Sequence, residues 1–493
     1  MTKKTLLIIG FIFLFFFINY FPHLYGWIKT SPDKFFSGHV SWFDPWDINN
    51  YLAAIRWGQN TKHFLYENLF TTEITKPFPI YFIYTLTGIV LPSVNLALLY
   101  HGLSMITGPF LLWIIFRNIL YFISNRTTAF FTLFLVCFGG GFGGLDISMT
   151  GLTFTGIWQK PHEIIALGLF LESLIGFTRL NNKTSVYKRW LLRVTLVISL
   201  ILYPFKIINY AIITGSWILL SWRTSDRVTL IKEWLVSLVF SAIILFSYTN
   251  KFSQSGFFSL LLNRYEAVNF IDVLIGYGFI IPLLIIGFII NPRINKLQQW
   301  LIVWITTTLI LTAFPFGWSR LYLSGLFFPL SLLTLIKLEI LMKQQRLIMV
   351  IFVFILIPLS TYFIFYQRIN AVNQTDNSWM YMSKKKQLGL KFIETQKADG
   401  VLANYILSNQ VSKLTGKHVY LGHLIQTPKA EEKYEKLMRF YQKEMNDNEA
   451  CMFLRGNKIN IIVFEDSEIQ KKYSQSCLSK QYENSEIVVF QVR

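Results

Sequence analysis

The sequence is poor in charged residues. Only 15% of its 493 residues are Asp, Glu, Lys or Arg, whereas 53% are hydrophobic and 17% are aromatic. A soluble globular protein has about 25% charged residues, and the mean hydropathy of +0.43 is well above the range of that class. The composition excludes an ordinary soluble domain and predicts a polytopic membrane protein.

Acidic residues are scarce even beside the few basic ones. The chain has 27 Asp and Glu against 46 Lys and Arg, which gives a net charge of +19. Such a surplus is one mark of nucleic-acid-binding proteins, but here the basic residues mostly punctuate apolar runs, as in 179–183 and 343–346. Basic clusters at the ends of membrane spans set topology. The charge pattern therefore favours a lipid bilayer over nucleic acid as the partner.

Cysteine is rare as well. Cys137 lies in an apolar run, and Cys451 and Cys477 lie in the polar C-terminal segment. If that segment is extracytoplasmic, where disulfides persist, the last two cysteines are able to pair. The spacing alone also allows two free thiols.

The amino terminus lacks the small residues of a signal-cleavage site. The apolar run from Leu6 to Phe21 is followed by 22–27, which are mostly bulky, so we predict an uncleaved anchor with a cytoplasmic amino terminus. Run length predicts about eleven spans across a hydrocarbon core of about 30 Å. They lie near residues 5–22, 96–116, 128–145, 163–178, 190–204, 207–222, 229–249, 271–290, 299–315, 321–337 and 347–366.

The basic loops alternate with less basic ones along the chain, which predicts one orientation of the protein in the membrane. The loops 117–126, 179–189, 223–232, 293–296 and 337–346 are expected in the cytoplasm. The loop 23–95 and the segment 367–493 are then expected outside. We predict a transmembrane domain over 1–366, which includes the loop 23–95, and an extracytoplasmic α/β domain over 367–493. The α/β prediction rests on strand-like runs at 401–403, 419–422, 461–464 and 487–492 and on an amphipathic helix at 430–445.

Two acids stand among aromatic residues in the first loop. In Trp42-Phe43-Asp44-Pro45-Trp46-Asp47, the pattern predicts a helix start with Asp44 as N-cap, Pro45 at the first position and Asp47 in the first turn. That structural role accounts for both acids. A carboxylate in a cleft beside a membrane is also able to act as a general base, and Tyr51, one turn after Asp47, would line the same face. Both interpretations stay open.

Other candidate residues are expected on the same side of the membrane. His162 and Glu163 open a helix and would line an outer cavity or cap that helix; because Ala166 follows four residues after His162, the zinc motif H-E-x-x-H is absent. Arg320 is suited to bind phosphate oxygens or to anchor a helix among aromatic residues. Lys206, in a tight turn, is a second phosphate candidate.

A glycine-rich run and a histidine pair match motifs that their context does not support. Residues 139–144 formally contain G-x-G-x-x-G, but no strand precedes them, so they predict close backbone packing or approach of a lipid-linked substrate instead of nucleotide binding. His418 and His423 lack acids or cysteines at ligand spacing and give no support for a metal site.

In the order of its features along the chain, the sequence resembles the GT-C superfamily, integral-membrane glycosyltransferases that use polyprenyl-phosphate-linked sugars. The first span, the long acidic and aromatic loop after it, the many spans and the C-terminal α/β segment carry this resemblance. It also looks like a bacterial group of largely uncharacterised membrane proteins. The recurring stretches of that group resemble Asp47–Ile55, Asn68–Glu73, 139–144, Pro161-His162, Arg320–Leu330 and Thr415–His423 with Thr427 and Lys429.

The resemblance implies a fold and a class of reaction. The sequence lacks the W-W-D-Y-G run of the oligosaccharyltransferases. It also lacks the adjacent Asp-Glu of the protein O-mannosyltransferases, because Pro45 and Trp46 separate the two aspartates. We expect an inverting transferase in which Asp47 or Asp44 is the base and Arg320, with Lys206, binds the departing phosphate. His162, Glu163 and Tyr51 would complete the substrate site. No cofactor is expected: no nucleotide is needed, and no motif supports a divalent metal. The acceptor is unspecified. A catalytically inactive envelope-assembly protein and a lipid or solute transporter are the alternatives.

Overall fold

The computed structural model describes residues 3–41, 45–77, 79–142, 158, 160–252, 269–314, 319–344, 351–374, 376–397, 399–465 and 477–493. The chain forms two compact units. The helical unit consists of Met1–Asn19, Leu103–Ser247 and Leu262–Gln367, and the mixed unit consists of Tyr20–Gly102, Tyr248–Leu261 and Arg368–Arg493. Four helices continue from one unit into the other: α1 (Lys3–Lys29), α4 (Leu96–Phe122), α9 (Arg227–Phe252) and α17 (Leu359–Asn373).

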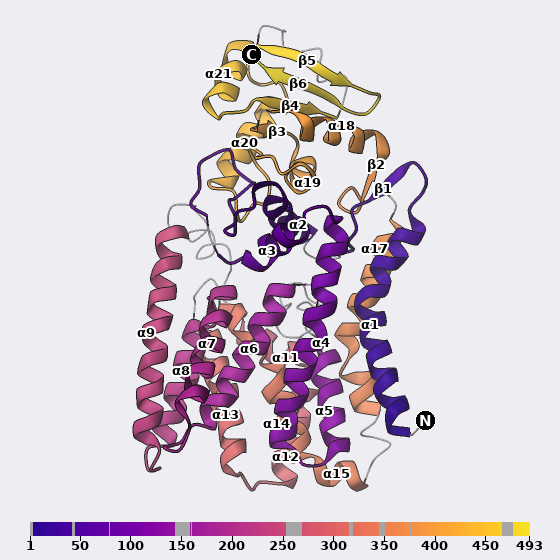
Figure 1. Cartoon of the computed structure of the whole chain (residues 1–493). Coiled ribbons are helices and arrows are strands. Elements are labelled where there is room, and N and C mark those ends of the chain that lie inside the picture. Colours follow the sequence, from indigo (N-terminus) through magenta and orange to yellow (C-terminus); the bar gives the residue numbers. More distant parts are fainter. Residues whose placement is uncertain are drawn as a thin grey trace. The chain divides into compact units, whose positions relative to one another are not determined.

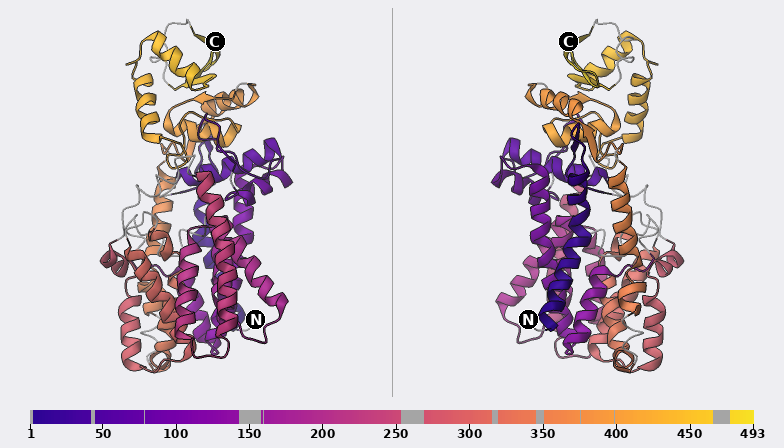
Figure 2. Two further views of the ribbon diagram at one scale, coloured as in Figure 1. Left: turned by 90° about the vertical axis from the view of Figure 1, so that its left-hand side faces the viewer. Right: turned by 90° about the vertical axis from the view of Figure 1, so that its right-hand side faces the viewer.

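Apolar helices that run side by side build the helical unit (Figure 1 and Figure 2). Polar caps start several of them: Asn125 accepts hydrogen bonds from the backbone of Thr127 and Thr128, and Asn295 forms a capping box with Gln298. Besides the four shared helices, the unit contains α5 (Arg126–Phe138), α6 (Pro161–Thr178), α7 (Val186–Leu202), α8 (Lys206–Leu220), α11 (Phe270–Gly276), α12 (Ile280–Ile290), α13 (Lys296–Ala313), the 3₁₀ helix η4 (Ser319–Leu323), α14 (Phe327–Lys337), α15 (Glu339–Gln344) and the π-helical η5 (Phe352–Leu356).

Four helices in the described part of the chain are long and apolar enough to cross a membrane. They are Ile8–Lys29, Leu96–Phe122, Pro161–Thr178 and Arg227–Thr249; α11 and α12, bent by 81°, would make a fifth if they form one span. The helices α5, α8 and α14 are apolar but shorter. A multi-pass membrane protein is therefore confirmed, whereas the number of eleven spans stays a prediction.

The first glycines of the 139–144 run serve backbone packing. Gly141 has a φ of +53° and Gly278, in the bend between α11 and α12, has a φ of +59°. A β-carbon on Gly278 would lie 2.8 Å from the Cα of Gly141, so the two backbones meet where no other residue fits. The Ser360 hydroxyl donates to the carbonyls of Gly140 and Gly141. Of the two interpretations of this run, packing accounts for Gly139 and Gly141; Gly143 and Gly144 lie outside the described residues.

The mixed unit contains a four-stranded sheet in the order β3-β4-β6-β5. Its strands are β3 (Val401–Leu402), β4 (Ile461–Phe464), β5 (Leu478–Glu483) and β6 (Val488–Val492); β3 is parallel to β4 and the other pairs are antiparallel. The helices of this segment are α18 (Lys384–Thr395), α19 (Tyr405–Thr415), α20 (Ala430–Tyr441) and α21 (Asp447–Gly456). The predicted α/β segment is confirmed, although 419–422 is not a strand: only Val419 forms a bridge, with Val401.

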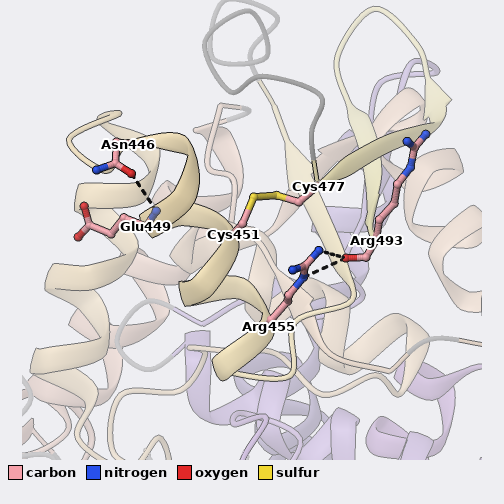
Figure 3. Close-up of a disulfide and its surroundings, with 6 residues drawn as sticks. All are labelled: Asn446, Glu449, Cys451, Arg455, Cys477 and Arg493. Atoms are coloured by element: carbon pink, nitrogen blue, oxygen red, sulfur yellow. Dashed lines mark hydrogen bonds between the residues drawn. A yellow bond between two sulfur atoms is a disulfide. The ribbon is translucent and has the colours of Figure 1, made fainter.

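A disulfide joins α21 to the start of β5. Cys451 and Cys477 are bonded across 26 residues with their Cα atoms 6.1 Å apart (Figure 3). Beside them the Arg455 guanidinium donates two hydrogen bonds to the carbonyl oxygen of Arg493, which closes the C-terminal end onto α21. The pairing of the two tail cysteines, left open by their spacing, is confirmed.

The first loop belongs to the mixed unit and not, as its place in the sequence suggested, with the transmembrane helices. Its strand β1 (Lys34–Phe36) pairs with β2 (Tyr381–Ser383), more than 340 residues later. Its helices α2 (Pro45–Thr61) and α3 (Phe82–Val90) pack backbone to backbone, since a β-carbon on Gly58 would meet the Thr85 carbonyl and one on Gly88 the Ile55 carbonyl. Backbone pairing between residues so distant in sequence leaves no local signal, so the sequence could not show it.

Candidate functional site

Asp47 lies in the first turn of α2, which begins at Pro45. A carboxylate there is favoured by the positive end of the helix dipole, so the structural role considered for this acid matches its position. Its side chain is 21% exposed. Asp44, the other candidate base, lies outside the described residues.

Asp47 also has a partner that could not be predicted from the sequence. The Nε2–H of His423 donates to Oδ1 of Asp47 across 2.9 Å, and the two residues are 376 positions apart. The His423 side chain is 4% exposed, and its Nδ1 is buried without a hydrogen-bond partner in the described part of the chain. A histidine in this position holds the carboxylate in one orientation.

Two segments that the resemblance singled out hold His423 in place, and they bind each other. The Asn68 amide donates to the carbonyl of Gln426 over 2.7 Å, and the Thr427 hydroxyl donates to the carbonyl of Phe70 over 2.8 Å. The backbone N–H groups of Gln426 and Thr427 both donate to the carbonyl of His423. Residues 68–73 and 415–427 thus form one hydrogen-bonded layer that fixes the histidine.

Lys433 of α20 also binds this layer, at residues 71–73. Its ammonium donates to the Thr71 hydroxyl over 2.9 Å and forms an ion pair with Glu73 over 2.8 Å. The layer therefore carries both neutral and charged bonds between the first loop and the C-terminal segment.

Tyr51, predicted to line the substrate site, is buried in an aromatic stack. Its ring is stacked on Tyr84 with centroids 5.0 Å apart and lies 5.8 Å from Tyr81 and 6.4 Å from Tyr100. Tyr81 in turn accepts a hydrogen bond from the side-chain amide of Gln426. The stack supports the face of α2 that follows Asp47.

In the helical unit, Lys206 is the first residue of α8 and is buried. Its ammonium donates to the carbonyl of Tyr322 over 2.9 Å and to the carbonyl of Ser324 over 2.5 Å. The Asn209 amide also donates to the Tyr322 carbonyl. Two of the three ammonium donors of Lys206 thus bind the backbone of the segment that contains Arg320. The backbone of Arg320 lies in η4, and its side chain is outside the described residues.

His162 and Glu163 open α6 behind Pro161, as expected from the sequence. His162 is buried, and Glu163 faces the ammonium of Lys160 at 3.7 Å. Glu163 also interacts electrostatically with Lys206. The structure therefore brings Glu163, Lys206 and the backbone around Arg320 together within the helical unit. In the described part of the chain, no three His, Cys, Asp or Glu side chains are grouped so that they could hold a metal ion.

Comparison with known proteins finds likeness in structure alone, since neither a family model nor a curated protein sequence matches the chain. The Archaeoglobus fulgidus oligosaccharyltransferase tethered with an acceptor peptide aligns over 92% of this chain and 69% of its own length, with a TM-score of 0.52 and 12% identity. ArnT from Cupriavidus metallidurans aligns over 98% of both chains, with a TM-score of 0.52 and 10% identity. Both structures share the fold of this chain. The chain has a GT-C fold.

The GT-C fold extends over both units, because each alignment spans nine-tenths of the chain or more. A third structure, the archaeal oligosaccharyltransferase AglB in complex with an inhibitory peptide and a dolichol-phosphate, aligns over 91% of this chain with a TM-score of 0.52. The expected GT-C resemblance and the helical membrane architecture with a C-terminal α/β segment are confirmed. Sequence identities of 12% or less show the fold and not the substrates.

Proposed function

We propose that the protein is an inverting glycosyltransferase that moves a sugar from a polyprenyl-phosphate carrier to an acceptor hydroxyl outside the cytoplasm. Two features support the proposal. The fold is that of the GT-C transferases, one of which, AglB, is known in complex with a dolichol-phosphate. The hydrogen bond between Asp47 and His423 is the single observation that carries it, because it holds a partly exposed carboxylate in a fixed orientation.

In the proposed reaction the acceptor oxygen attacks the anomeric carbon while the bond from that carbon to the phosphate oxygen breaks. The phosphate leaves with the bonding electrons, and the acceptor's proton passes to the Asp47 carboxylate. His423 donates a hydrogen bond to that carboxylate and keeps its orientation fixed. Asp44, three residues earlier, is the alternative base.

The leaving phosphate develops negative charge that needs stabilisation. We assign this role to Arg320, whose planar guanidinium can bind two phosphate oxygens at once. Lys206 already donates to the carbonyls of Tyr322 and Ser324, so its proposed contribution is to hold the Arg320 segment and to add positive charge nearby. Glu163 and His162 would line the same part of the helical unit, and Tyr51 would support α2 behind Asp47.

The test is a transfer assay on the purified full-length protein in lipid nanodiscs, supplied with a panel of polyprenyl-phosphate sugars and an envelope extract as acceptor. The proposal predicts release of polyprenyl phosphate that depends on the acceptor and on Asp47 or Asp44. Movement of intact lipid-linked sugar between leaflets without its consumption would support the transporter alternative instead. Wild-type activity in both Asp47→Asn and Asp44→Asn would contradict the assignment of the base.

A further inference from the structure

A second site lies in the mixed unit, on the opposite end of α2 from Asp47. An open cavity of about 840 Å³ is lined by the end of α1, the β1 segment, α2, residues 92–97, α18 and α19 (the elements are labelled in Figure 1). Small-molecule sites commonly have about 300–1,000 Å³. Arg56 of α2 lines it, and nine residues at 1.5 Å each place Arg56 about 13 Å along the helix from Asp47.

The charged residues that line this cavity are mainly cationic. They are Lys34, Arg56, Lys391 and Lys413, with Glu394 as the one carboxylate among them. Glu394 faces Arg56 at 3.7 Å, so it offsets one of the four positive charges. The remaining positive charge suits an anionic ligand.

Lys413 is the most unusual of these groups. It is 1% exposed, and its ammonium has no hydrogen-bond partner in the described part of the chain. Leaving a buried ammonium without partners is costly, and burial lowers the pKa of Lys413 to about 7. An acceptor oxygen next to this ammonium would supply the missing partner.

Two further polar atoms near Lys413 lack partners. The Nε of Arg56 is buried without one, and so is the Nε2 of His39, whose imidazole interacts electrostatically with Lys413. Native proteins rarely leave such atoms unsatisfied. Lys413 and Arg56 both line the cavity, so two residues of its wall carry a donor group without a partner, which indicates a site for acceptor oxygens.

Aromatic residues are also part of the lining. Trp27, Phe35 and Phe36 all border the cavity. Flat rings offer an apolar surface on which the C–H face of a sugar ring packs, while phosphate or carboxylate oxygens match ammonium and guanidinium donors.

We propose that this cavity binds an acidic glycan, a sugar chain that carries phosphate or carboxylate groups. Lys413 and Arg56 bind the acidic group, and the aromatic rings bind the adjoining sugar. This assignment rests on the proposed function. The glycan is the acceptor or its growing chain, and the cavity holds a part of it that is distant from the hydroxyl that reacts at Asp47.

The test measures binding to the full-length protein in detergent by calorimetry, independently of transfer. Three probes of similar length distinguish phosphate, carboxylate and neutral ligands: an oligomer of glycerol phosphate, an oligogalacturonate and a neutral maltooligosaccharide. We expect one or both acidic probes to bind and the neutral one to bind at least about tenfold more weakly, the ratio expected for a charged hydrogen bond. Equal binding of all three would overturn the proposal.

Two variants locate the site. Lys413→Met keeps the length of the side chain without its charge, and it should weaken the acidic probe about tenfold or more. Lys480→Met, at an exposed lysine of β5 paired with Glu483, is the matched control and should bind normally. If Lys413→Met folds poorly, Arg56→Gln is the second variant in which binding of the acidic probe is measured. Normal binding in both cavity variants would overturn the proposal.

A failure of this site is distinguishable from a failure of the proposed function. Asp47→Asn should bind the acidic probe as the wild type does, because Asp47 does not line the cavity. Binding that is lost in Asp47→Asn but kept in Lys413→Met would place the glycan at Asp47 and contradict the second site.

Discussion

Two aspartate–histidine pairs lie in the mixed unit, and their hydrogen bonds are of similar length: 2.9 Å from His423 to Asp47 and 2.7 Å from His418 to Asp399. The first pair joins residues 376 positions apart and the second joins residues 19 positions apart. The Asp399 side chain is 57% exposed, against 21% for Asp47. The local pair ties a turn to the bridge at Val419, whereas the distant pair joins the first loop to the C-terminal segment.

The comparison indicates different roles for the same two side chains. An exposed pair contributes about 0–1 kcal/mol to stability, and nothing in the geometry of Asp399 suggests more. The Asp47 pair lies between two segments that are hydrogen-bonded to each other over 68–73 and 415–427, and its histidine is buried. We therefore expect function to depend on one pair and only local stability on the other.

The largest expected effect is on turnover in Asp47→Asn. Loss of the proton acceptor should lower turnover by roughly 10²–10⁴, while the unfolding temperature changes little, because asparagine accepts the same hydrogen bond. Asp399→Asn is the matched control and should keep near wild-type turnover. The comparison fails if the two variants lose activity equally in the lipid-linked donor assay.

The disulfide sharpens the comparison with a link that is structural only. Cys451 and Cys477 close a loop of 26 residues, so replacing both with serine should lower the free energy of unfolding of the mixed unit by roughly 3 kcal/mol in the chain-entropy model. Chemical denaturation followed by tryptophan fluorescence would measure this. Turnover of the folded variant should stay close to that of the wild type; a drop as large as that of Asp47→Asn would connect the sheet to catalysis and contradict the separation of roles.

Arg320→Lys tests whether the helical unit contributes to the same reaction. Lysine keeps the charge but loses the two-pronged phosphate contact, so we expect turnover to fall about tenfold, the loss expected for one charged hydrogen bond. Lys337→Arg is the control, because Lys337 donates to the carbonyls of Asn291 and Arg293, away from the Arg320 segment. Unchanged turnover in Arg320→Lys would remove Arg320 from the phosphate site.

The smallest expected effect is a pH dependence that comes from Lys413. Its pKa is lowered to about 7 in the folded protein by burial, so between about pH 7 and pH 10 the unfolded chain binds more protons than the folded one. Stability should therefore rise with pH across that window, and the rise should be smaller in Lys413→Met. His39, which interacts electrostatically with Lys413, and the other charged residues of the cavity, Arg56, Glu394, Lys34 and Lys391, are the same in both proteins, so the difference between their melting curves isolates the contribution of Lys413. Identical slopes would show that Lys413 is protonated in the folded state.

Much of the fold follows from local sequence patterns. Apolar run length predicts the membrane helices, and the alternating runs near 461–464 and 487–492 correspond to β4 and β6. Pro45 predicts the start of α2. These features depend on neighbouring residues, so one sequence is enough to reveal them.

The pairing of Asp47 with His423 does not follow from such patterns. His423 has no acid nearby in sequence, and its partner Asp47 belongs to a loop that precedes nearly all of the membrane helices. Lys413, in the last turn of α19, has the appearance of an ordinary basic residue at a helix end. Only the packing of the first loop against the C-terminal segment buries His423 and Lys413 and shows what they contact.

A double-mutant cycle on Asp47 and His423 tests whether the two side chains act together in catalysis. Glutamine at 423 is polar but does not reproduce the imidazole, so His423→Gln should slow turnover by less than Asp47→Asn does. If the two residues act as one unit, the double variant should be about as slow as Asp47→Asn alone. Losses that multiply in the double variant, or full turnover in Asp47→Asn, would contradict the account.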